Sequence, residues 1–207
     1  MHVKENQSVG NIILLREQSK RNRRPSIALV LFLSFSLLVA CGTPEVGSVA
    51  DMSGYEELDE KDTQLFIVSD VRDFLKRLDG GESFAAFFGF TECPWCNDAI
   101  SLLNSEAESA GQNVYYINTR PNPRVSKNSE IPDYDLLVSR VAEYLGVNDE
   151  GEPYLFVPFV FFVREGEIVF THQGTVSGYD PSGMEMSEEQ IQEVRNIYRN
   201  GFEMIHP

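Results

Sequence analysis

Residues 83–90, SFAAFFGF, constrain the fold of this chain more than any other stretch. They form an apolar run as long as one β-strand, and polar residues do not alternate with the apolar ones. Such a run is expected for a strand that is buried on both faces, as in sheets that carry helices on either side. The stretch therefore predicts a central strand of an α/β domain.

Strand and helix patterns alternate along the chain from residue 62 onward. The predicted elements are, in order, strand 64–68, a helix from Ser69 to Gly80, strand 83–90, a helix from Cys93 to Gly111, strand 113–118, helix 134–146, a hairpin of strands 158–164 and 167–173, and a helix from Ser187 to about Ile205. Ser187 and Gln190 match a capping box at the start of the last helix. The order βαβαβαββα predicts a mixed central sheet of parallel strands joined by helical crossovers, closed by an antiparallel hairpin and flanked by helices.

Two of the three cysteines flank a proline and a tryptophan in the stretch TECPWCNDAI, directly after the central strand. A thiol attacks a disulfide only as the thiolate, and the unpaired N–H groups and the dipole at a helix start favour that charge. Pro94 fits the first helical position, which puts Cys93 at the helix start. We therefore predict that Cys93 is the attacking thiolate, with an exposed sulfur. Cys96, one turn further in, is then the resolving thiol.

Two other interpretations of this cysteine pair remain. One is an inert structural disulfide, which would require neither an exposed first sulfur nor a helix start. The other is a zinc site, which needs two more ligands, and the histidines that follow residue 40 are His172 and His206. We expect no metal and no cofactor besides the redox-active Cys93–Cys96 disulfide itself.

The chain resembles the thioredoxin superfamily over roughly residues 62–205. The resemblance depends on the sequence CPWC after the second strand and on Val157-Pro158 before the hairpin. It implies a thioredoxin-like fold in which a cis Pro158 faces the cysteines and the backbone of Val157 pairs with a bound substrate segment. Trp95 stands where the glutaredoxins carry an aromatic residue, and it would form a substrate-docking surface or shield the disulfide. The alternative for Pro158 is a proline that only opens a strand.

Two positions depart from thioredoxin itself. Phe87, six residues before Cys93, occupies the place of a buried aspartate that in thioredoxin helps to move the proton of the resolving thiol. Cys96 would then depend on water or on a substrate group. Glu92 replaces an aromatic residue, and a carboxylate beside Cys93 should disfavour the thiolate. The motif therefore does not predict the redox potential.

Residues 1–40 have the layout of a secretory signal peptide, in which the basic stretch KRNRRPS precedes the apolar run IALVLFLSFSLLVA. The residues LVAC that end at Cys41 resemble the lipobox of bacterial lipoproteins. This implies cleavage before Cys41 and a lipid on its sulfur that anchors the protein outside the cytoplasm. An ordinary signal peptide or an uncleaved anchor is the alternative. Residues 41–61 are polar and acidic and predict a flexible tether, which leaves 62–207 as the thioredoxin-like domain.

The charge of the chain restricts its partners. The formal net charge is −15, and residues 1–40 hold six of the Lys and Arg residues and two of the Asp and Glu residues. Their removal leaves a net charge of −19. Such a surface repels phosphate backbones and anionic lipid headgroups, so we expect no nucleic-acid binding and a membrane contact through the lipid on Cys41 alone.

These features together predict a membrane-tethered, extracytoplasmic thiol–disulfide oxidoreductase that acts on protein substrates and is recharged by a redox partner the sequence does not identify. The layout also resembles the thioredoxin-like and transport-accessory lipoproteins of Gram-positive bacteria. The alternatives are a non-enzymatic accessory module of an export system and a metal chaperone. Residues 119–133 are either a solvated insertion or a partner-recognition loop that carries three basic residues, Arg120, Arg124 and Lys127.

Overall fold

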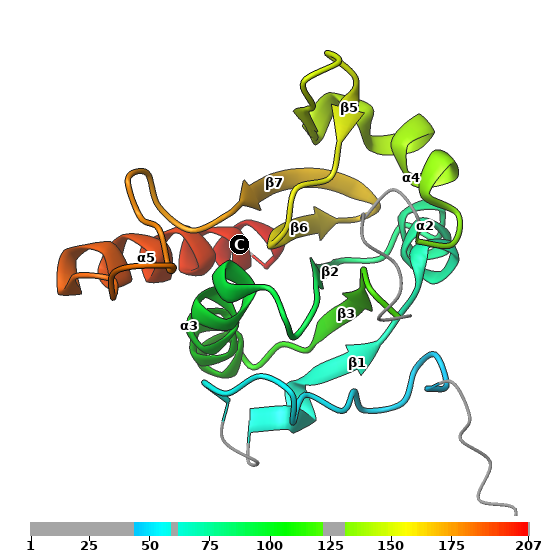
Figure 1. Cartoon of the computed structure of the whole chain (residues 1–207). Helices are drawn as coiled ribbons and strands as arrows, with labels where there is room; N and C mark the ends of the chain where they lie inside the picture. Colours follow the sequence, from blue (N-terminus) through cyan, green and yellow to red (C-terminus); the bar gives the residue numbers. More distant parts are fainter. Residues whose placement is uncertain (1–43, 59–61, 122–130, 207) are drawn as a thin grey trace, which may run out of the picture. The chain divides into compact units, whose positions relative to one another are not determined.

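The computed structural model describes residues 44–58, 62–121 and 131–206 (Figure 1). The elements are η2 (Asp62–Leu65), β1 (Phe66–Val68), α2 (Val71–Asp79), β2 (Phe84–Gly89), α3 (Pro94–Ala110), β3 (Val114–Asn118), α4 (Tyr134–Val141), η4 (Ala142–Tyr144), β4 (Gly146–Val147), β5 (Pro153–Tyr154), β6 (Phe159–Arg164), β7 (Glu167–Gln173) and α5 (Glu188–Ile205). The predicted order of strands and helices is confirmed, with the short strands β4 and β5 added before the hairpin.

The five longer strands form one mixed sheet in the order β1-β3-β2-β6-β7. β3 is parallel to both β1 and β2, whereas β6 is antiparallel to β2 and to β7. Helices α3 and α5 pack against each other on one face of the sheet, and α2 and α4 lie on the other (Figure 1). This is the predicted α/β arrangement of a thioredoxin-like fold.

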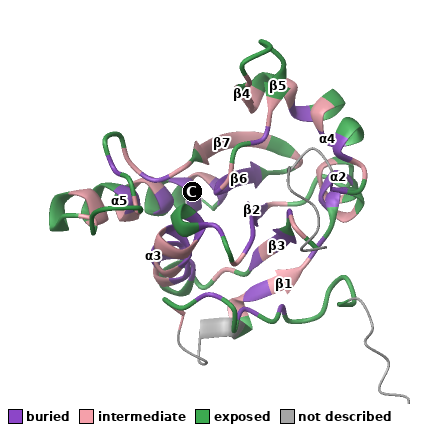
Figure 2. Cartoon of the chain, in the orientation of Figure 1, coloured by how far each residue is buried: buried purple, intermediate pink, exposed green. Residues whose placement is uncertain are grey.

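The strand β2 lies at the centre of the sheet and is buried along its whole length (Figure 2). Phe87 points into the core cluster shared with α3 and α5, and Phe88 points into the cluster on the opposite face. The prediction of a strand buried on both faces is therefore confirmed. Because β2 leads directly into α3, it positions the two cysteines at the end of a rigid element.

The segment that precedes β1 belongs to the folded domain. Ala50, Met52 and Tyr55 are 3%, 0% and 1% exposed, and they pack in the same core cluster as the start of α3. Backbone hydrogen bonds also join this segment to β1. The prediction of a flexible tether over 41–61 is therefore wrong for the part that the structure describes. The prediction failed because the stretch is polar on average, although a few of its apolar side chains belong to the core. The domain therefore begins well before residue 62.

Some helix ends also differ from the prediction. Helix α2 begins after Asp70 and not after Ser69, because the Asp70 carboxylate accepts a hydrogen bond from the backbone N–H of Asp73 at 2.7 Å. Helix α4 ends at Val141 and not at 146, since the chain continues as η4 and then pairs β4 with β5. The capping box at the start of α5 is present as predicted.

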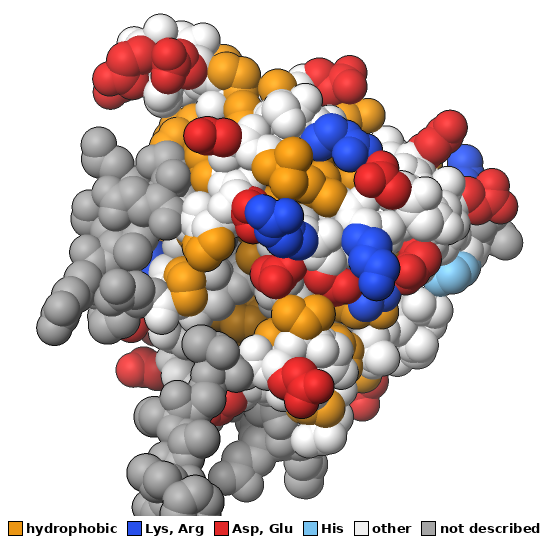
Figure 3. Space-filling model, turned by 90° about the vertical axis from the view of Figure 1, so that its right-hand side faces the viewer, with side chains coloured by type: hydrophobic (Ala, Val, Ile, Leu, Met, Phe, Trp, Pro, Cys, Tyr) orange, Lys and Arg blue, Asp and Glu red, His pale blue; other side chains and the backbone are white. Residues whose placement is uncertain are grey.

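The face that carries α2 and α4 mixes basic and acidic side chains (Figure 3). Its exposed ion pairs include Arg72–Asp133 and Arg140–Asp79, each with an N–O distance of 2.6 Å. The less exposed Arg77 pairs with Asp73 and Glu82 at 2.9 and 2.7 Å. Exposed pairs contribute little to stability, so the fold depends mainly on its two apolar clusters.

The predicted signal peptide over residues 1–40 and the predicted lipid site Cys41 lie outside the described residues. Within the described ranges, no helix combines the length and the apolar character that a membrane span requires. The lipid anchor therefore stays a prediction from the sequence.

Candidate active site

Cys93 is the N-cap residue of α3, where the sequence placed it. Its Sγ accepts a hydrogen bond from the backbone N–H of Cys96 at 3.2 Å, and Pro94 occupies the first turn of the helix. The Cys93 carbonyl oxygen accepts from the N–H groups of Cys96 and Asn97 at 3.0 and 3.1 Å. Both sulfurs are free thiols in the structure. The helix start thus provides a backbone donor aimed at the first sulfur.

The pKa of Cys93 is lowered, above all by a hydrogen bond from the Cys96 side chain and less by the one from the Cys96 backbone N–H. Burial opposes this shift of the pKa, and the positive charge of Arg120 reinforces it. The Asp98 carboxylate, inside the first turns of α3, raises the pKa. The sequence assigned this opposing role to Glu92, which is exposed and accepts a hydrogen bond from Thr91. The balance of these effects favours the thiolate.

The substrate-facing residues implied by the thioredoxin resemblance lie beside Cys93. The Val157–Pro158 peptide bond is cis, as the resemblance implied. The Cys93 Sγ lies 3.9 Å from the carbonyl oxygen of Val157, although 64 residues separate them in the chain. Trp95 is 38% exposed. The fold therefore brings together Cys93, Val157 and Pro158, with Trp95 at the surface next to them.

The expectation of an exposed Cys93 sulfur is wrong, because Cys93 is only 5% exposed and Cys96 is 0% exposed. The backbone carbonyl of Val157 lies against the Cys93 Sγ, a contact that the local sequence does not reveal.

Aromatic side chains surround the second sulfur. Burial raises the pKa of Cys96, and the neighbouring sulfur raises it further. The Phe87 ring stacks on Tyr116 with 6.2 Å between ring centroids, and the hydroxyl groups of Tyr116 and Tyr55 lie 3.3 Å apart. A side chain at Gly89 would lie 2.5 Å from the Phe87 ring and 3.2 Å from the Cys96 Sγ, so a glycine is needed there. Phe87 thus places an apolar ring beside Cys96, at the position where the resemblance to thioredoxin would put a carboxylate.

Arg120 is a site residue whose role the sequence did not predict. Its guanidinium lies 3.8 Å above the ring centroid of Phe90 and lowers the pKa of both cysteines. The sequence placed it in residues 119–133, either a solvated insertion or a partner-recognition loop, of which residues 122–130, with Arg124 and Lys127, lie outside the described residues. The predicted topology could have indicated this position of Arg120. Because β2 and β3 are parallel, the residues that follow the two strands, Cys93 and Arg120 among them, lie at the same edge of the sheet.

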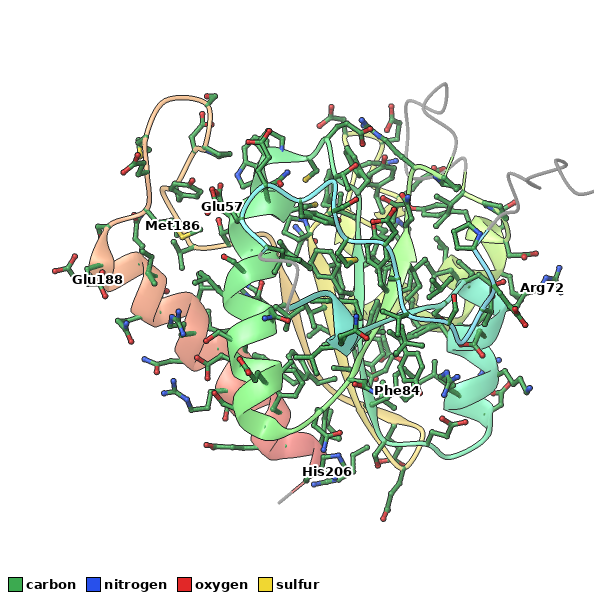
Figure 4. All side chains as sticks on the ribbon, turned by 90° about the horizontal axis from the view of Figure 1, so that it is seen from below. Glu57, Arg72, Phe84, Met186, Glu188 and His206 are labelled. Atoms are coloured by element: carbon green, nitrogen blue, oxygen red, sulfur yellow. The ribbon has the colours of Figure 1, made fainter. Side chains whose placement is uncertain are left out.

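A cleft of about 650 Å³ borders the N-terminal end of α3. Pro94, Leu102, Met184 and Met186 contribute apolar surface to it, and Figure 4 labels Met186 beside Glu57, another lining residue. Its acidic lining residues are Glu56, Glu57, Glu92, Asp98 and Glu185. Among the described residues that line the cleft, none is Lys or Arg. The electrostatic potential in this cleft therefore favours positively charged segments of a partner.

The zinc interpretation requires further ligands close to the two sulfurs. Over residues 44–58, 62–121 and 131–206, no three His, Cys, Asp or Glu side chains are close enough together to hold one metal ion. What the described site offers chemically is two thiols of unequal acidity.

The pH dependence of Cys93 alkylation is expected to report the lowered pKa directly. In a Cys96→Ser background, the rate with iodoacetamide should have its midpoint below about 8.5, the ordinary value of a cysteine thiol. Arg120→Met should move this midpoint upward, because a nearby positive charge that lowers the pKa of Cys93 is lost. Mass spectrometry of the Cys93 peptide measures the rate.

The matched control is Arg72→Met, which removes a positive charge whose partner, Asp133, lies on the far side of the sheet from α3. It should leave the midpoint unchanged. A midpoint at or above the ordinary value in the Cys96→Ser protein would contradict the assignment of Cys93 as the more acidic thiol.

Comparisons with known proteins identify no family for this chain. No protein-family model matches the chain, and no curated protein matches it. Among solved structures, the chain is similar to a protein proposed to be an oxidoreductase with a thioredoxin fold. The sequence identity is 14% and the TM-score is 0.40, over 56% of this chain and 88% of the other. This likeness is too weak to assign an activity.

Proposed function

We propose that the chain is a thiol–disulfide oxidoreductase that exchanges disulfides with protein substrates through Cys93 and Cys96. The observation that carries this proposal is the inequality of the two sulfurs. The Cys93 Sγ accepts a backbone hydrogen bond at 3.2 Å and its pKa is lowered, whereas Cys96 is fully buried and its pKa is raised. One thiol is prepared to attack, and the other keeps its proton until a mixed disulfide has formed.

The proposed reaction has two exchange steps. The Cys93 thiolate first attacks one sulfur of a substrate disulfide, and the bonding pair leaves with the other substrate sulfur. Cys96 then attacks the Cys93 Sγ, which releases the remaining substrate sulfur and leaves the Cys93–Cys96 disulfide. An extended substrate segment would pair with the backbone of Val157, whose carbonyl oxygen already lies beside the Cys93 Sγ. The reverse sequence of the same steps transfers a disulfide to a substrate.

A second function is favoured by one observation, the 5% exposure of Cys93. A chain that used this fold only to bind a partner would need no accessible sulfur. In that case the pair would show no exchange with small disulfides. The two functions therefore differ in a measurable property of the cysteines.

The reduction potential of the purified protein in a glutathione buffer tests the proposal, with Trp95 fluorescence as the signal. We expect a reversible change of the Trp95 fluorescence, because Trp95 lies between Cys93 and Cys96 in the chain. A value near about −120 mV would identify a donor of disulfides and one near about −270 mV a reductant. The absence of a transition would reject the oxidoreductase and leave the partner-binding function.

We further propose that residues 1–40 direct export and that Cys41 carries a lipid that holds the protein at the outer side of the cytoplasmic membrane. This part of the proposal depends on the sequence resemblance to the lipobox. Mass spectrometry of the mature amino terminus should show a chain that begins at Cys41 with an attached diacylglycerol. A mature protein that retains residues 1–40, or that lacks a lipid, would contradict it.

A further inference from the structure

The cleft beside the N-terminal end of α3 is built from parts of the chain that the exchange chemistry does not use. The first turns of α3 line it together with the segment before β1 and the connection of residues 174–187 between β7 and α5. Figure 4 labels one residue of each of these two segments, Glu57 and Met186, near the N-terminal end of α3. The connection is longer than the usual length of about 4–6 residues, and long ordered connections are usually functional.

Hydrogen bonds hold the parts of the cleft together. The backbone N–H of Glu56 donates to the Asn97 side-chain oxygen at 3.2 Å, and the Asn97 amide donates to the carbonyl of Thr91 at 2.6 Å. On the other side, the Tyr179 hydroxyl donates to the Asp98 carboxylate at 2.7 Å and so ties the connection to α3. A ligand therefore meets a surface that is already formed, which lowers the entropy cost of binding.

Part of the cleft surface is apolar. Met184 is 53% exposed although it lines the cleft. Met186 and Ile191 pack only partly against the core and also line the cleft. Methionine side chains are flexible and polarizable, so they adapt to apolar ligands of different shapes. The cleft therefore offers a contact surface for apolar side chains of a ligand.

The acidic side chains of the cleft have no basic partners within the described residues. There, no Lys or Arg forms an ion pair with Glu56, Glu57 or Glu185, and no lining residue is Lys or Arg. On the opposite face of the sheet, by contrast, Asp79 and Asp133 each pair with an arginine. Carboxylates without partners give the cleft a negative potential that complements a basic ligand.

These properties favour a polypeptide segment over other occupants. In the part of the chain that the structure describes, no three His, Cys, Asp or Glu side chains are close enough together to hold one metal ion, so the carboxylates do not converge on a point. Nucleic acids and anionic lipids would be repelled. A second copy of the chain would bring further negative charge, because the formal net charge is −15. A segment with both basic and apolar side chains complements both parts of the surface.

We propose that this cleft docks a substrate segment that carries basic and apolar side chains, a few residues away from the disulfide that Cys93 attacks. Glu92 and Pro94, the neighbours of Cys93 in the chain, both line the cleft, so a docked segment lies close to the reactive residue. The proposal rests on the oxidoreductase function proposed above and identifies its substrate class. Docking adds no chemical step to the exchange.

Two synthetic peptides that differ only in charge test the proposal. Each carries one cysteine as a mixed disulfide with nitrothiobenzoate, and the flanking sequence is either Lys-Leu-Lys or Glu-Leu-Glu. The Cys93 thiolate attacks the peptide sulfur, and the bonding pair leaves with the coloured nitrothiobenzoate, which stopped-flow absorbance records. The reduced Cys41→Ser protein is used, so that the third thiol does not react. Each rate is divided by the rate with mercaptoethanol, which corrects for the reactivity of the peptide itself.

The basic peptide is expected to react at least about tenfold faster than the acidic peptide at low salt. The ratio of the two rates should fall as salt is added, because ions screen exposed charges. In the triple variant Glu56→Gln, Glu57→Gln and Glu185→Gln, the ratio should fall about threefold or more. The ratio cancels any change in the reactivity of Cys93. The three side chains are exposed, so their replacement leaves the fold intact.

The matched control is the triple variant Glu143→Gln, Glu150→Gln and Glu152→Gln. These side chains are exposed and do not line the cleft, and their replacement changes the net charge by the same amount. The control should keep the ratio of the wild-type protein. If both triple variants lower the ratio equally, the preference arises from the charge of the whole protein, and the docking site is overturned.

The apolar contact is tested with a basic peptide in which serine replaces the leucine. The wild-type protein should prefer the leucine peptide, and Met184→Ser should remove this preference. Val147→Ser is the control, because Val147 is 65% exposed and does not line the cleft. A leucine preference that survives Met184→Ser would overturn the apolar contact.

The remaining outcomes separate the docking site from the function on which it rests. Equal rates for the basic and acidic peptides would overturn the docking site while the exchange function stands. If neither peptide releases nitrothiobenzoate, the oxidoreductase function itself fails. A dimer in sedimentation that Met184→Ser dissociates would assign the cleft to a second copy of the chain and also overturn the proposal.

Discussion

Cys93→Ser is expected to abolish disulfide exchange, and Cys96→Ser is expected to stop it at a mixed disulfide. The physical reason is the difference between the two sulfurs: the Cys93 Sγ accepts the hydrogen bond from the Cys96 backbone N–H and borders the Val157 carbonyl, and its pKa is lowered. Cys96 is fully buried, and burial raises its pKa. Gel electrophoresis under non-reducing conditions, with a small disulfide-bonded protein as substrate, measures the covalent adduct.

The matched control for these variants is Cys41→Ser. It removes the third thiol, which we assign to lipid attachment, and should leave the exchange rate in detergent unchanged. Adducts that accumulate with Cys93→Ser and not with Cys96→Ser would reverse the two roles. Exchange that survives both substitutions would show that the pair is not the reactive group.

Removal of residues 42–61 is expected to unfold the domain at temperatures where the full chain is stable. Met52 and Tyr55 are 0% and 1% exposed, and Tyr55 also packs edge to face on Tyr116 with 6.1 Å between ring centroids. Met52→Ala alone should cost about 2–5 kcal/mol, a large share of the roughly 5–15 kcal/mol that holds a domain folded. Urea unfolding followed by circular dichroism measures the loss.

The same segment also contacts the first turn of α3. The backbone N–H of Glu56 donates to the Asn97 side-chain oxygen at 3.2 Å, and Asn97 in turn donates to the carbonyl of Cys93. Val46→Ala is the matched control, because Val46 is 42% exposed and should change the stability by less than about 0.5 kcal/mol. If the shortened chain unfolds at the same urea concentration as the full one, the segment does not stabilise the fold.

The sequence alone determined the order of the elements and the helix start at Cys93. Both depend on patterns within a few residues: an uninterrupted apolar run for β2, and a proline in the first turn of α3. The cis bond before Pro158 followed from the family resemblance. Local backbone geometry and hydrophobic periodicity act over such short ranges, so a single sequence carries these signals.

Only the tertiary structure decided which distant side chains surround the sulfurs. It brought Arg120 near Cys93, assigned the opposing carboxylate to Asp98, and placed His172 against Tyr198. It also buried Cys93 and drew Ala50, Met52 and Tyr55 into the core, against the predictions. Contacts of this kind join segments that are far apart in the chain, so no periodic pattern of residues in the sequence predicts them. They form only when the helices pack against the sheet.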